Sequence, residues 1–337
     1  MVTRVQARGG MRFAFAGTPE FGAWVLDHLI EIGRAPVLVV SQPDRPAGRG
    51  RTLQRPAVVE RAAAAGLAWV QTDDINRAAV LDDLAAAGAR TLVVAAFGQL
   101  LKSPILTAAT CINVHASLLP RYRGAAPISR SLMAGEAESG VCIMRMVAGL
   151  DEGPLAVLRR LSIGLRDDAG SLARALALLG ALGVAQVLDG LEDGNVTWAE
   201  QRGAPSYAAK LTPSDRDLDL GGTALSVHNQ VRALAPDVGA VTDLGGLRCT
   251  VWRSWPYGEP PLDPPPPSAT AVVDVPGRVR AADGRLYCGC GAGVLELLAV
   301  QPAGKRTMRA DEFLRGYGAR LVDGASSDPP RSSSRKE

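Results

Sequence analysis

The first two hundred residues alternate between short apolar runs and longer stretches in which apolar residues follow helical spacing. Apolar runs with the length of buried strands occupy residues 12–16, 36–40, 67–71, 91–96, 111–114, 141–146 and 155–162. Helical patterns occupy residues 21–32, 57–65, 77–87 and 169–191. Continuously apolar strands are typical of sheets that are covered on both faces. This alternation predicts an α/β domain with a Rossmann-like, doubly wound, mostly parallel sheet.

The pattern changes near residue 205. A short helix is expected near residues 225–234, and short strands separated by glycine and proline follow at residues 247–252, 271–275, 277–281, 286–288 and 294–300. Short, closely spaced strands of this kind are typical of a small antiparallel β-barrel. The proline-rich residues 259–267 cannot pair within a sheet, so we expect them to form an exposed loop.

These patterns divide the chain into five segments. We expect a disordered extension at residues 1–10, an α/β domain at 11–200, a linker at 201–224, a β-barrel domain at 225–324 and a disordered polar tail at 325–337. A chain of 337 residues is long enough for two domains that each have a core of their own.

Composition narrows the class of protein further. No apolar run approaches the roughly 20 residues that span a bilayer, so no membrane association is expected. The five cysteines are odd in number and form no CxxC pair, which argues against zinc and redox chemistry. We therefore expect a reduced, cytoplasmic, monomeric protein without a metal. The net charge of +3 does not by itself indicate nucleic-acid binding, so the local distribution of charge has to be considered.

The first strand and helix resemble the start of a dinucleotide-binding fold. After Gly17, Thr18 offers a capping hydroxyl, Pro19 suits a first helical turn, and Glu20 suits the positive end of the helix dipole. The motif GxGxxG is absent, however, and Gly17 stands alone. We therefore discount a nicotinamide or flavin dinucleotide as cofactor.

Two polar side chains interrupt the apolar run at residues 111–114. Asn113 and His115 are two residues apart, which places them on one face of the expected strand. A loop follows, and Pro127 then opens a helix. Ligand sites in open α/β sheets lie where parallel strands end. Asp151, just past the next predicted strand, is expected within reach of His115.

A structural role for these polar residues is the alternative, because an asparagine and a histidine at a strand end often only satisfy core or capping hydrogen bonds. The chain has only three histidines, so a histidine without a functional role at this position is less expected. His28 and His228 both fall in predicted helices, where a partly exposed helical position explains them.

A long polar loop at residues 42–56 carries Arg45, Arg49, Arg51 and Arg55 among prolines and glycines, with Asp44 as its only acid. It can be neither helix nor central strand. Loops of this length are usually functional or disordered. It is therefore either a mobile solvated loop or a cationic finger that touches a phosphate backbone.

Several strings resemble the folate-dependent formyltransferase family. Asn-Val-His at 113–115, Ser-Leu-Leu-Pro at 117–120 and the loop around Asp151 carry the general resemblance. The continuation Arg-Tyr-Arg-Gly-Ala-Ala-Pro-Ile at 121–128 resembles the branch that formylates charged tRNA. The strings at residues 15–21, 42–50, 207–211 and 298–305 agree with it. The resemblance is collinear over roughly residues 11–320.

The resemblance implies a fold, substrates and site residues. The second domain would be of the oligonucleotide-binding (OB) type. The co-substrate would be 10-formyltetrahydrofolate, and the partner would be the acceptor arm of initiator methionyl-tRNA. No metal would be needed. Asn113, His115 and Asp151 would be catalytic. Folate would be bound by Phe97, Gly98, Ser117, Leu118, Leu119, Pro120, Gly149 and Leu150. The tRNA would be contacted by Arg45, Arg49, Arg51, Arg55, Lys210, Lys305 and Arg306.

The proposed chemistry needs these residue types. Formyl transfer to an amine passes through an oxyanionic tetrahedral centre, and preorganised donors around such charge contribute most of the catalysis. Asn113 can donate to the oxyanion, and His115 can do so as an imidazolium, a form that Asp151 would favour. Asp151 is also the candidate acceptor for the proton of the attacking amine.

Two other readings stay open. One is a relative that formylates a nucleotide-sugar amine or hydrolyses formyltetrahydrofolate, although neither needs a cationic finger. The other is a non-catalytic nucleic-acid-binding protein on the same fold, which would have no use for Asn113, His115 and Asp151. The sequence departs from the family at residues 236–239 and in the proline-rich loop, and both departures lie in the second domain.

Overall fold

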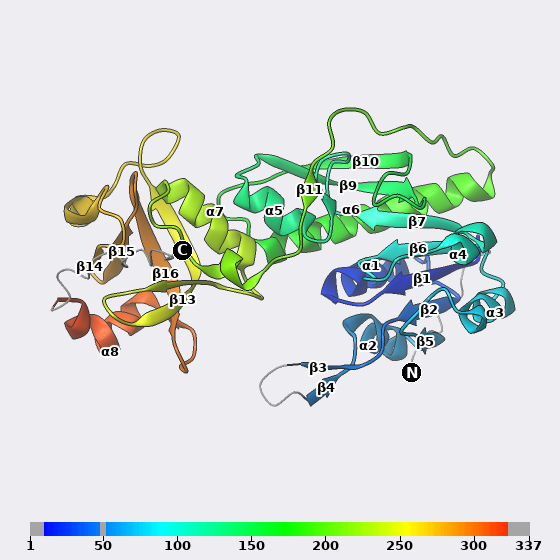
Figure 1. The fold of residues 1–337 in the computed structure, drawn as a ribbon, viewed down its shortest axis with the longest axis horizontal. Helices are drawn as coiled ribbons and strands as arrows, with labels where there is room; N and C mark the ends of the chain where they lie inside the picture. Colours follow the sequence, from blue (N-terminus) through cyan, green and yellow to red (C-terminus); the bar gives the residue numbers. More distant parts are fainter. Residues whose placement is uncertain (1–9, 48–51, 323–337) are drawn as a thin grey trace, which may run out of the picture. The chain divides into compact units, whose positions relative to one another are not determined.

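The computed structural model describes residues 10–47 and 52–322, and these residues form two compact units (Figure 1). The first comprises the residues up to 131, 137–165 and 171–210, and the second comprises 132–136, 166–170 and those from 211 onward. The expected linker at 201–224 is thus divided between the units at residue 210. The expected tail, and all of the expected extension except Gly10, lie outside the described residues.

The first unit is built on a seven-stranded sheet with the order β10-β9-β7-β6-β1-β2-β5. Strands β1, β2, β5, β6 and β7 pair in parallel, whereas β9 and β10 are antiparallel additions at one edge. The strands are β1 (Phe13–Gly17), β2 (Leu38–Ser41), β5 (Trp69–Gln71), β6 (Thr91–Ala95), β7 (Thr110–His115), β9 (Glu138–Arg145) and β10 (Leu155–Ser162). The predicted Rossmann-like, mostly parallel sheet is confirmed.

Helices cover this sheet on both faces, as the apolar strands require. They are α1 (Glu20–Glu31), α2 (Ala57–Ala64), α3 (Ala78–Ala86), α4 (Ser103–Ala108) and α6 (Ala169–Glu192). Helix α5 (Pro127–Met133) follows the loop after β7. Cys111 of β7 belongs to the buried cluster that includes Leu84 of α3 and Ile105 of α4. The side chains that share a strand face with Cys111 therefore continue from this core toward the end of β7.

The opposite face of β7 is packed against α6. A Cβ at Gly180 would lie 2.6 Å from Val114 Cγ1, and one at Gly183 would lie 2.8 Å from Ile143 Cγ1. The two glycines thus permit close approach of α6 to β7 and β9. Among the described helices, α6 alone is long and apolar enough to cross a membrane, and 56% of its most apolar stretch is buried inside the protein. Its apolar character is explained by this packing.

Three local features of the first unit differ from expectation. Thr18 does not cap α1; its hydroxyl instead donates to the carbonyl of Phe97 (3.0 Å). The loop at 42–56 contains a small hairpin of β3 (Arg45–Ala47) and β4 (Thr52–Gln54), which is separate from the central sheet. The short helix α4 was not expected, because its six residues are too few to reveal a helical period.

The second unit contains an antiparallel sheet with the order β12-β13-β16-β15-β14, and β17 also pairs with β16. The strands are β12 (Ala240–Asp243), β13 (Arg248–Tyr257), β14 (Val279–Ala282), β15 (Arg285–Gly289), β16 (Val294–Pro302) and β17 (Met308–Arg309). Helices α7 (Ala224–Leu234) and α8 (Ala310–Val322) contribute Val227 and Phe313 to its core. The predicted antiparallel second domain is confirmed.

One predicted strand of this unit is wrong. Residues 267–272 form the 3₁₀ helix η2 (Pro267–Val272) where the sequence suggested a strand at 271–275. The preceding prolines fix φ and remove backbone donors, which favours a tight turn over a ladder. A second 3₁₀ helix, η1 (Pro213–Arg216), precedes α7. The proline-rich residues themselves run between β13 and η2, as expected for a loop.

Candidate active site

Strand β7 positions the polar pair of the candidate site. Asn113 pairs with Val94 of β6 and with Met144 of β9, and His115 pairs with Cys142. Both side chains lie on the face opposite Val114, which packs on α6. His115 is 5% exposed, and Asn113 is partly exposed. Among the described residues, the side-chain amide of Asn113 has no hydrogen-bond partner.

His115 is held between two oxygen atoms of the protein. Its Nε2 donates to the carbonyl of Tyr122 (2.9 Å), and its Nδ1 lies 3.6 Å from Asp151 Oδ2. A carbonyl only accepts, so the Tyr122 contact requires a hydrogen on Nε2. When Nδ1 also carries a hydrogen, the ring is an imidazolium and attracts the carboxylate of Asp151. Neither ring nitrogen points to an open position in this arrangement.

Asp151 is placed by its own turn and by the loop after β7. The turn between β9 and β10 begins beside β7, where Met146 donates its N–H to the carbonyl of Cys111 (2.8 Å). It then folds back along β7, so that Asp151 Oδ2 accepts the N–H of Gly124 (2.8 Å) and faces His115. Asp151 has φ +50°, a left-handed conformation that few non-glycine residues adopt. The structure therefore brings together the three predicted catalytic residues.

The loop after β7 is fixed largely through buried groups. Ser117 Oγ donates to the carbonyl of Arg121 (2.7 Å), and Ser117 N donates to the carbonyl of His115 (3.0 Å). Leu119 packs with Cys142 and Met144. A Cβ at Gly140 would lie 2.4 Å from Leu118 Cδ2, so Leu118 also packs on β9.

The loop after β6 is the other predicted folate element. Phe97 is 2% exposed and belongs to the buried core, so its ring lines no open site. Its carbonyl accepts from Thr18 Oγ1 (3.0 Å) and from Gln42 Nε2 (2.6 Å). Gly98 is exposed with φ +79°, and a Cβ there would lie 2.7 Å from Gln42 Nε2. Glycine is therefore favoured at this position by its left-handed backbone and by the close approach of the Gln42 amide.

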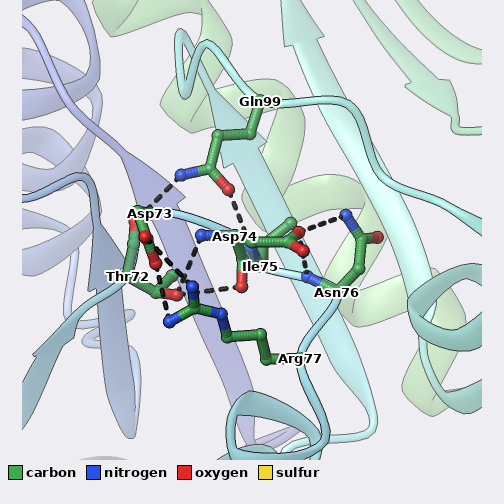
Figure 2. Close-up of polar contacts among 7 residues, drawn as sticks. All are labelled: Thr72, Asp73, Asp74, Ile75, Asn76, Arg77 and Gln99. Atoms are coloured by element: carbon green, nitrogen blue, oxygen red, sulfur yellow. Dashed lines mark hydrogen bonds and ion pairs between the residues drawn. The ribbon is translucent and has the colours of Figure 1, made fainter.

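The loop at residues 72–77 forms hydrogen bonds with the loop after β6, through Gln99 among others (Figure 2). Gln99 Nε2 donates to the carbonyl of Thr72 (2.9 Å), and Gln99 Oε1 accepts the N–H of Ile75 (2.7 Å). Asn76 Nδ2 donates to the carbonyl of Leu100 (3.0 Å), and Asn76 Oδ1 accepts the N–H of Lys102 (2.7 Å). The loop after β6, which contains the predicted folate residues Phe97 and Gly98, is thus held in place by its neighbours.

The predicted folate residues fall into two groups. Gly98 and Leu150 are exposed, and Leu150 has an exposed fraction of 54%. Phe97, Ser117, Leu119 and Pro120 are buried, so they can offer a ligand little more than backbone groups. Leu118 and Gly149 are intermediate.

The predicted cationic residues are distributed over both units. In the first unit, Arg45 donates to Gln42 Oε1 (2.5 Å), and the Arg55 guanidinium lies 5.8 Å from the centre of the Trp69 ring. Lys210 is exposed in the same unit. Arg49 and Arg51 lie outside the described residues.

The second unit holds the remaining two cations. Lys305 is exposed, and its backbone carbonyl accepts from Gln301 Nε2 (2.7 Å). Arg306 forms an ion pair with Glu312. A phosphate would have to compete with this carboxylate for Arg306, whereas Lys305 is the more accessible cation.

The cysteines are buried and unpaired. Burial raises the pKa of Cys111 and Cys288 to about 12 and that of Cys142 to about 11. Their thiols therefore remain protonated at neutral pH. Within the described residues, no group of three or more histidine, cysteine, aspartate or glutamate side chains could hold a metal.

Sequence reasoning missed several residues that shape the site. Tyr122, at φ +60°, supplies a backbone carbonyl to His115, and a backbone group leaves no mark in the sequence. Gln42, Gln99 and Gln201 each support a site loop through their amides. Gln42 and Gln99 directly follow or lie near strand ends, which was an available signal.

Comparisons with known proteins identify relatives along most of the chain. Residues 11–188 match the formyl transferase family, and residues 210–318 match the formyl transferase C-terminal domain. A methionyl-tRNA formyltransferase of Methylococcus capsulatus is 41% identical over 310 residues, covering 91% of this chain and 97% of the relative. One of Symbiobacterium thermophilum is 39% identical over 329 residues, covering 97% and 98%.

A similarity in fold extends to a more distant structure. HypX from Aquifex aeolicus, solved in complex with tetrahydrofolic acid, has a TM-score of 0.64 to this chain at 14% identity. The similarity covers 98% of this chain and 50% of HypX. It therefore concerns the fold of this half of HypX.

Proposed function

The chain belongs to the formyl transferase family, within its methionyl-tRNA formyltransferase branch, and we propose that it formylates initiator methionyl-tRNA at the site formed by Asn113, His115 and Asp151. The formyl group comes from 10-formyltetrahydrofolate and is transferred to the α-amino group of the methionine. The protein is thus a one-carbon transferase of translation initiation.

The unpaired amide of Asn113 is the observation that carries this assignment of the site. Asn113 is partly exposed, so its amide is accessible to a substrate. That amide has no partner among the described residues, whereas His115 and Asp151 are engaged with Tyr122 and Gly124. An amide left free between fixed neighbours is a preorganised donor for charge that develops only during the reaction.

The reaction follows from these positions. The amine nitrogen attacks the formyl carbon, and the carbonyl oxygen becomes an oxyanion that accepts an N–H from Asn113. Asp151 takes the proton that the amine loses as the new C–N bond forms. The bond from the formyl carbon to N10 then breaks, and N10 receives that proton from Asp151. No net acid or base is consumed, and the carboxylate is regenerated.

His115 has a positioning role in this scheme. Its Nε2 hydrogen is committed to Tyr122, so donation from His115 to the oxyanion would require the ring to leave the position described here. Its Nδ1 side faces Asp151 at 3.6 Å and provides a positive neighbour when protonated. We therefore assign the oxyanion to Asn113 and the support of Asp151 to His115.

The surroundings of the site fit a pterin with a flat ring and a polar edge. Gly98 leaves its backbone accessible. Leu100 in the loop after β6 and Leu150 in the β9–β10 turn are exposed apolar side chains. Backbone groups at residues 98–101 and 117–120 would hold the ring edge. Gln99 (Figure 2) and Asn76 fix the loop after β6, so this loop needs little ordering when folate binds.

The tRNA would be bound through its phosphates. Arg45 and Arg55 lie at the base of the β3–β4 hairpin, and Lys210 is exposed in the same unit. Lys305 and Arg306 supply a separate cationic site in the second unit. Phosphate contacts of this kind set position and orientation but do not read sequence.

The alternative of a sugar formyltransferase or a formyltetrahydrofolate hydrolase is not favoured. The relatives at about 40% identity over most of the chain are methionyl-tRNA formyltransferases, and both domains of the family are matched. We further propose that the protein works as a monomer and in the cytoplasm, where its unpaired cysteines would remain reduced. Light scattering would support this with a mass of 35.2 kDa and refute it with a multiple.

The direct test uses purified protein with labelled 10-formyltetrahydrofolate and methionyl-tRNA. Hydrolysis of the ester bond after the reaction should release N-formylmethionine that carries the label. The Asn113→Ala variant should yield about 10²–10³-fold less in the same time. Wild-type protein that leaves the methionine unformylated would overturn the proposed function.

A further inference from the structure

The segment between the two matched family regions contributes to the candidate active site. The matches end at residue 188 and resume at residue 210, so residues 189–209 belong to neither. Ala199 nevertheless pairs with Leu155 at the start of β10. Further on, Tyr207 and Ala208 form strand β11 (Tyr207–Ala208), which pairs in parallel with β8 (Arg123–Gly124) in the loop after β7.

Ser206 ties the segment to that loop. Its Oγ accepts the N–H of Tyr122 (2.9 Å), and its carbonyl accepts the N–H of Arg123 (2.8 Å). Tyr122 is the residue whose own carbonyl accepts from His115. The segment thus supports both the residue that holds His115 and the strand that ends at Gly124.

Gln201 supports the other side of the site. Its Nε2 donates to the carbonyl of Asp151 (2.7 Å) and to the carbonyl of Gly153 (2.9 Å). Its Oε1 accepts from Arg123 Nη2 (2.8 Å), and Arg123 Nη1 also contacts Glu152 Oε1 (3.1 Å). One amide therefore joins the turn that carries Asp151 to the loop that carries Gly124.

We propose that Gln201 is a positioning residue for Asp151 and that formyl transfer depends on it. This inference rests on the proposed function of the site. Asp151 has φ +50°, a conformation that persists only where the surroundings impose it. The two hydrogen bonds from Gln201 impose it by fixing the carbonyls on either side of Glu152.

The consequence for activity follows from geometry. The carboxylate of Asp151 must remain in place for the amine, and it lies 3.6 Å from His115 Nδ1 and 2.8 Å from Gly124 N. A misplacement of about 1 Å in a reacting group can lower the rate about 10²-fold. Loss of Gln201 should therefore lower kcat and affect substrate binding little, because Gln201 touches neither substrate in this scheme.

Two substitutions separate the donor role from mere packing. Gln201→Met keeps the approximate size and removes every hydrogen bond. Gln201→Glu keeps an acceptor for Arg123 but has no N–H for the carbonyls of Asp151 and Gly153. Gln186→Met is the matched control, because Gln186 is an exposed glutamine of the same unit whose only hydrogen bond among the described residues is the one that it accepts from Arg159 Nη2.

The measurements are kcat and the KM of each substrate, with the melting temperature as a check of folding. We expect both Gln201 variants to lose about 10–100-fold in kcat, with each KM within about threefold of wild type, and Gln186→Met to be unchanged. A Gln201→Glu variant with wild-type kcat would overturn the proposal, because the Arg123 contact alone would then suffice.

A double substitution tests whether Gln201 acts through Asp151. In the Asp151→Asn background, Gln201→Met should cost less than about twofold, because the group that it positions is already disabled. Multiplicative losses would overturn the proposal. Failure of the proposed function looks different: wild-type protein would itself transfer no formyl group to methionyl-tRNA, whatever residue 201 is.

Discussion

Replacing Asn113 should change the rate of formyl transfer strongly and the free energy of unfolding very little. The amide has no partner among the described residues, and Asn113 is partly exposed, so Asn113→Ala removes no hydrogen bond of the folded state. Its free energy of unfolding should therefore change by no more than about 0.5 kcal/mol. Loss of one oxyanion donor, in contrast, costs about 2.7–4 kcal/mol in the transition state, or about 10²–10³ in kcat.

The assay is single-turnover formyl transfer with 10-formyltetrahydrofolate saturating and enzyme in excess over methionyl-tRNA, at an enzyme concentration well above the Kd for the tRNA. Under these conditions binding does not limit the rate. Asn113→Asp should be at least as slow as Asn113→Ala, because a carboxylate offers no donor and repels an oxyanion. Asn195→Ala, at an exposed asparagine beyond α6, is the matched control and should react at the wild-type rate. An Asn113→Ala rate within about threefold of wild type would refute the assignment of the oxyanion.

Three further expectations concern other parts of the molecule. Asp151→Asn keeps an acceptor for Gly124 N–H but loses basicity, so kcat should fall about 10²–10⁴-fold at an unchanged KM for folate; a normal kcat would exclude Asp151 as the proton acceptor. Arg55→Ala should weaken tRNA binding and lower the slope of log Kd against log salt by about 1, whereas Arg160→Ala, which loses a pair with Glu138, should change neither; equal slopes for Arg55→Ala and wild type would remove Arg55 from the interface. Because burial raises the pKa of Cys111 to about 12, the folded state retains a proton that the unfolded state loses above about pH 9. The free energy of unfolding should therefore decline above that pH by up to about 1.4 kcal/mol per pH unit for this thiol, and less so in Cys111→Ala; pH titrations with parallel curves for the two proteins would contradict this.

The central sheet was predictable because its inner strands are buried on both faces. Residues 92–96 are all apolar, residues 111–114 are apolar except for Asn113, and the two runs form most of β6 and β7. Asn113 and His115 were visible for the same reason, since polar residues stand out within an apolar strand. Asp151 was found by its place after the next strand, and the fold-back of the β9–β10 turn brings it to His115.

Short elements and contacts distant in sequence were not predictable. Strand β12 has four residues and α4 has six, too few for a period to emerge. The role of Gln201 depends on a separation of 50 residues from Asp151, and no local pattern encodes such a contact. Thr18 has the residue type of a helix cap, but its hydroxyl bonds to Phe97, because tertiary contacts override local preference.

The measurement that tests the central claim most directly is a competition for the formyl group. Labelled 10-formyltetrahydrofolate is offered with methionyl initiator tRNA, methionyl elongator tRNA and a free amino sugar in one reaction. We expect label on the initiator tRNA, none on the sugar, and its loss in the Asn113→Ala variant. Release of free formate or formylation of the sugar, with both tRNAs unlabelled, would contradict the account.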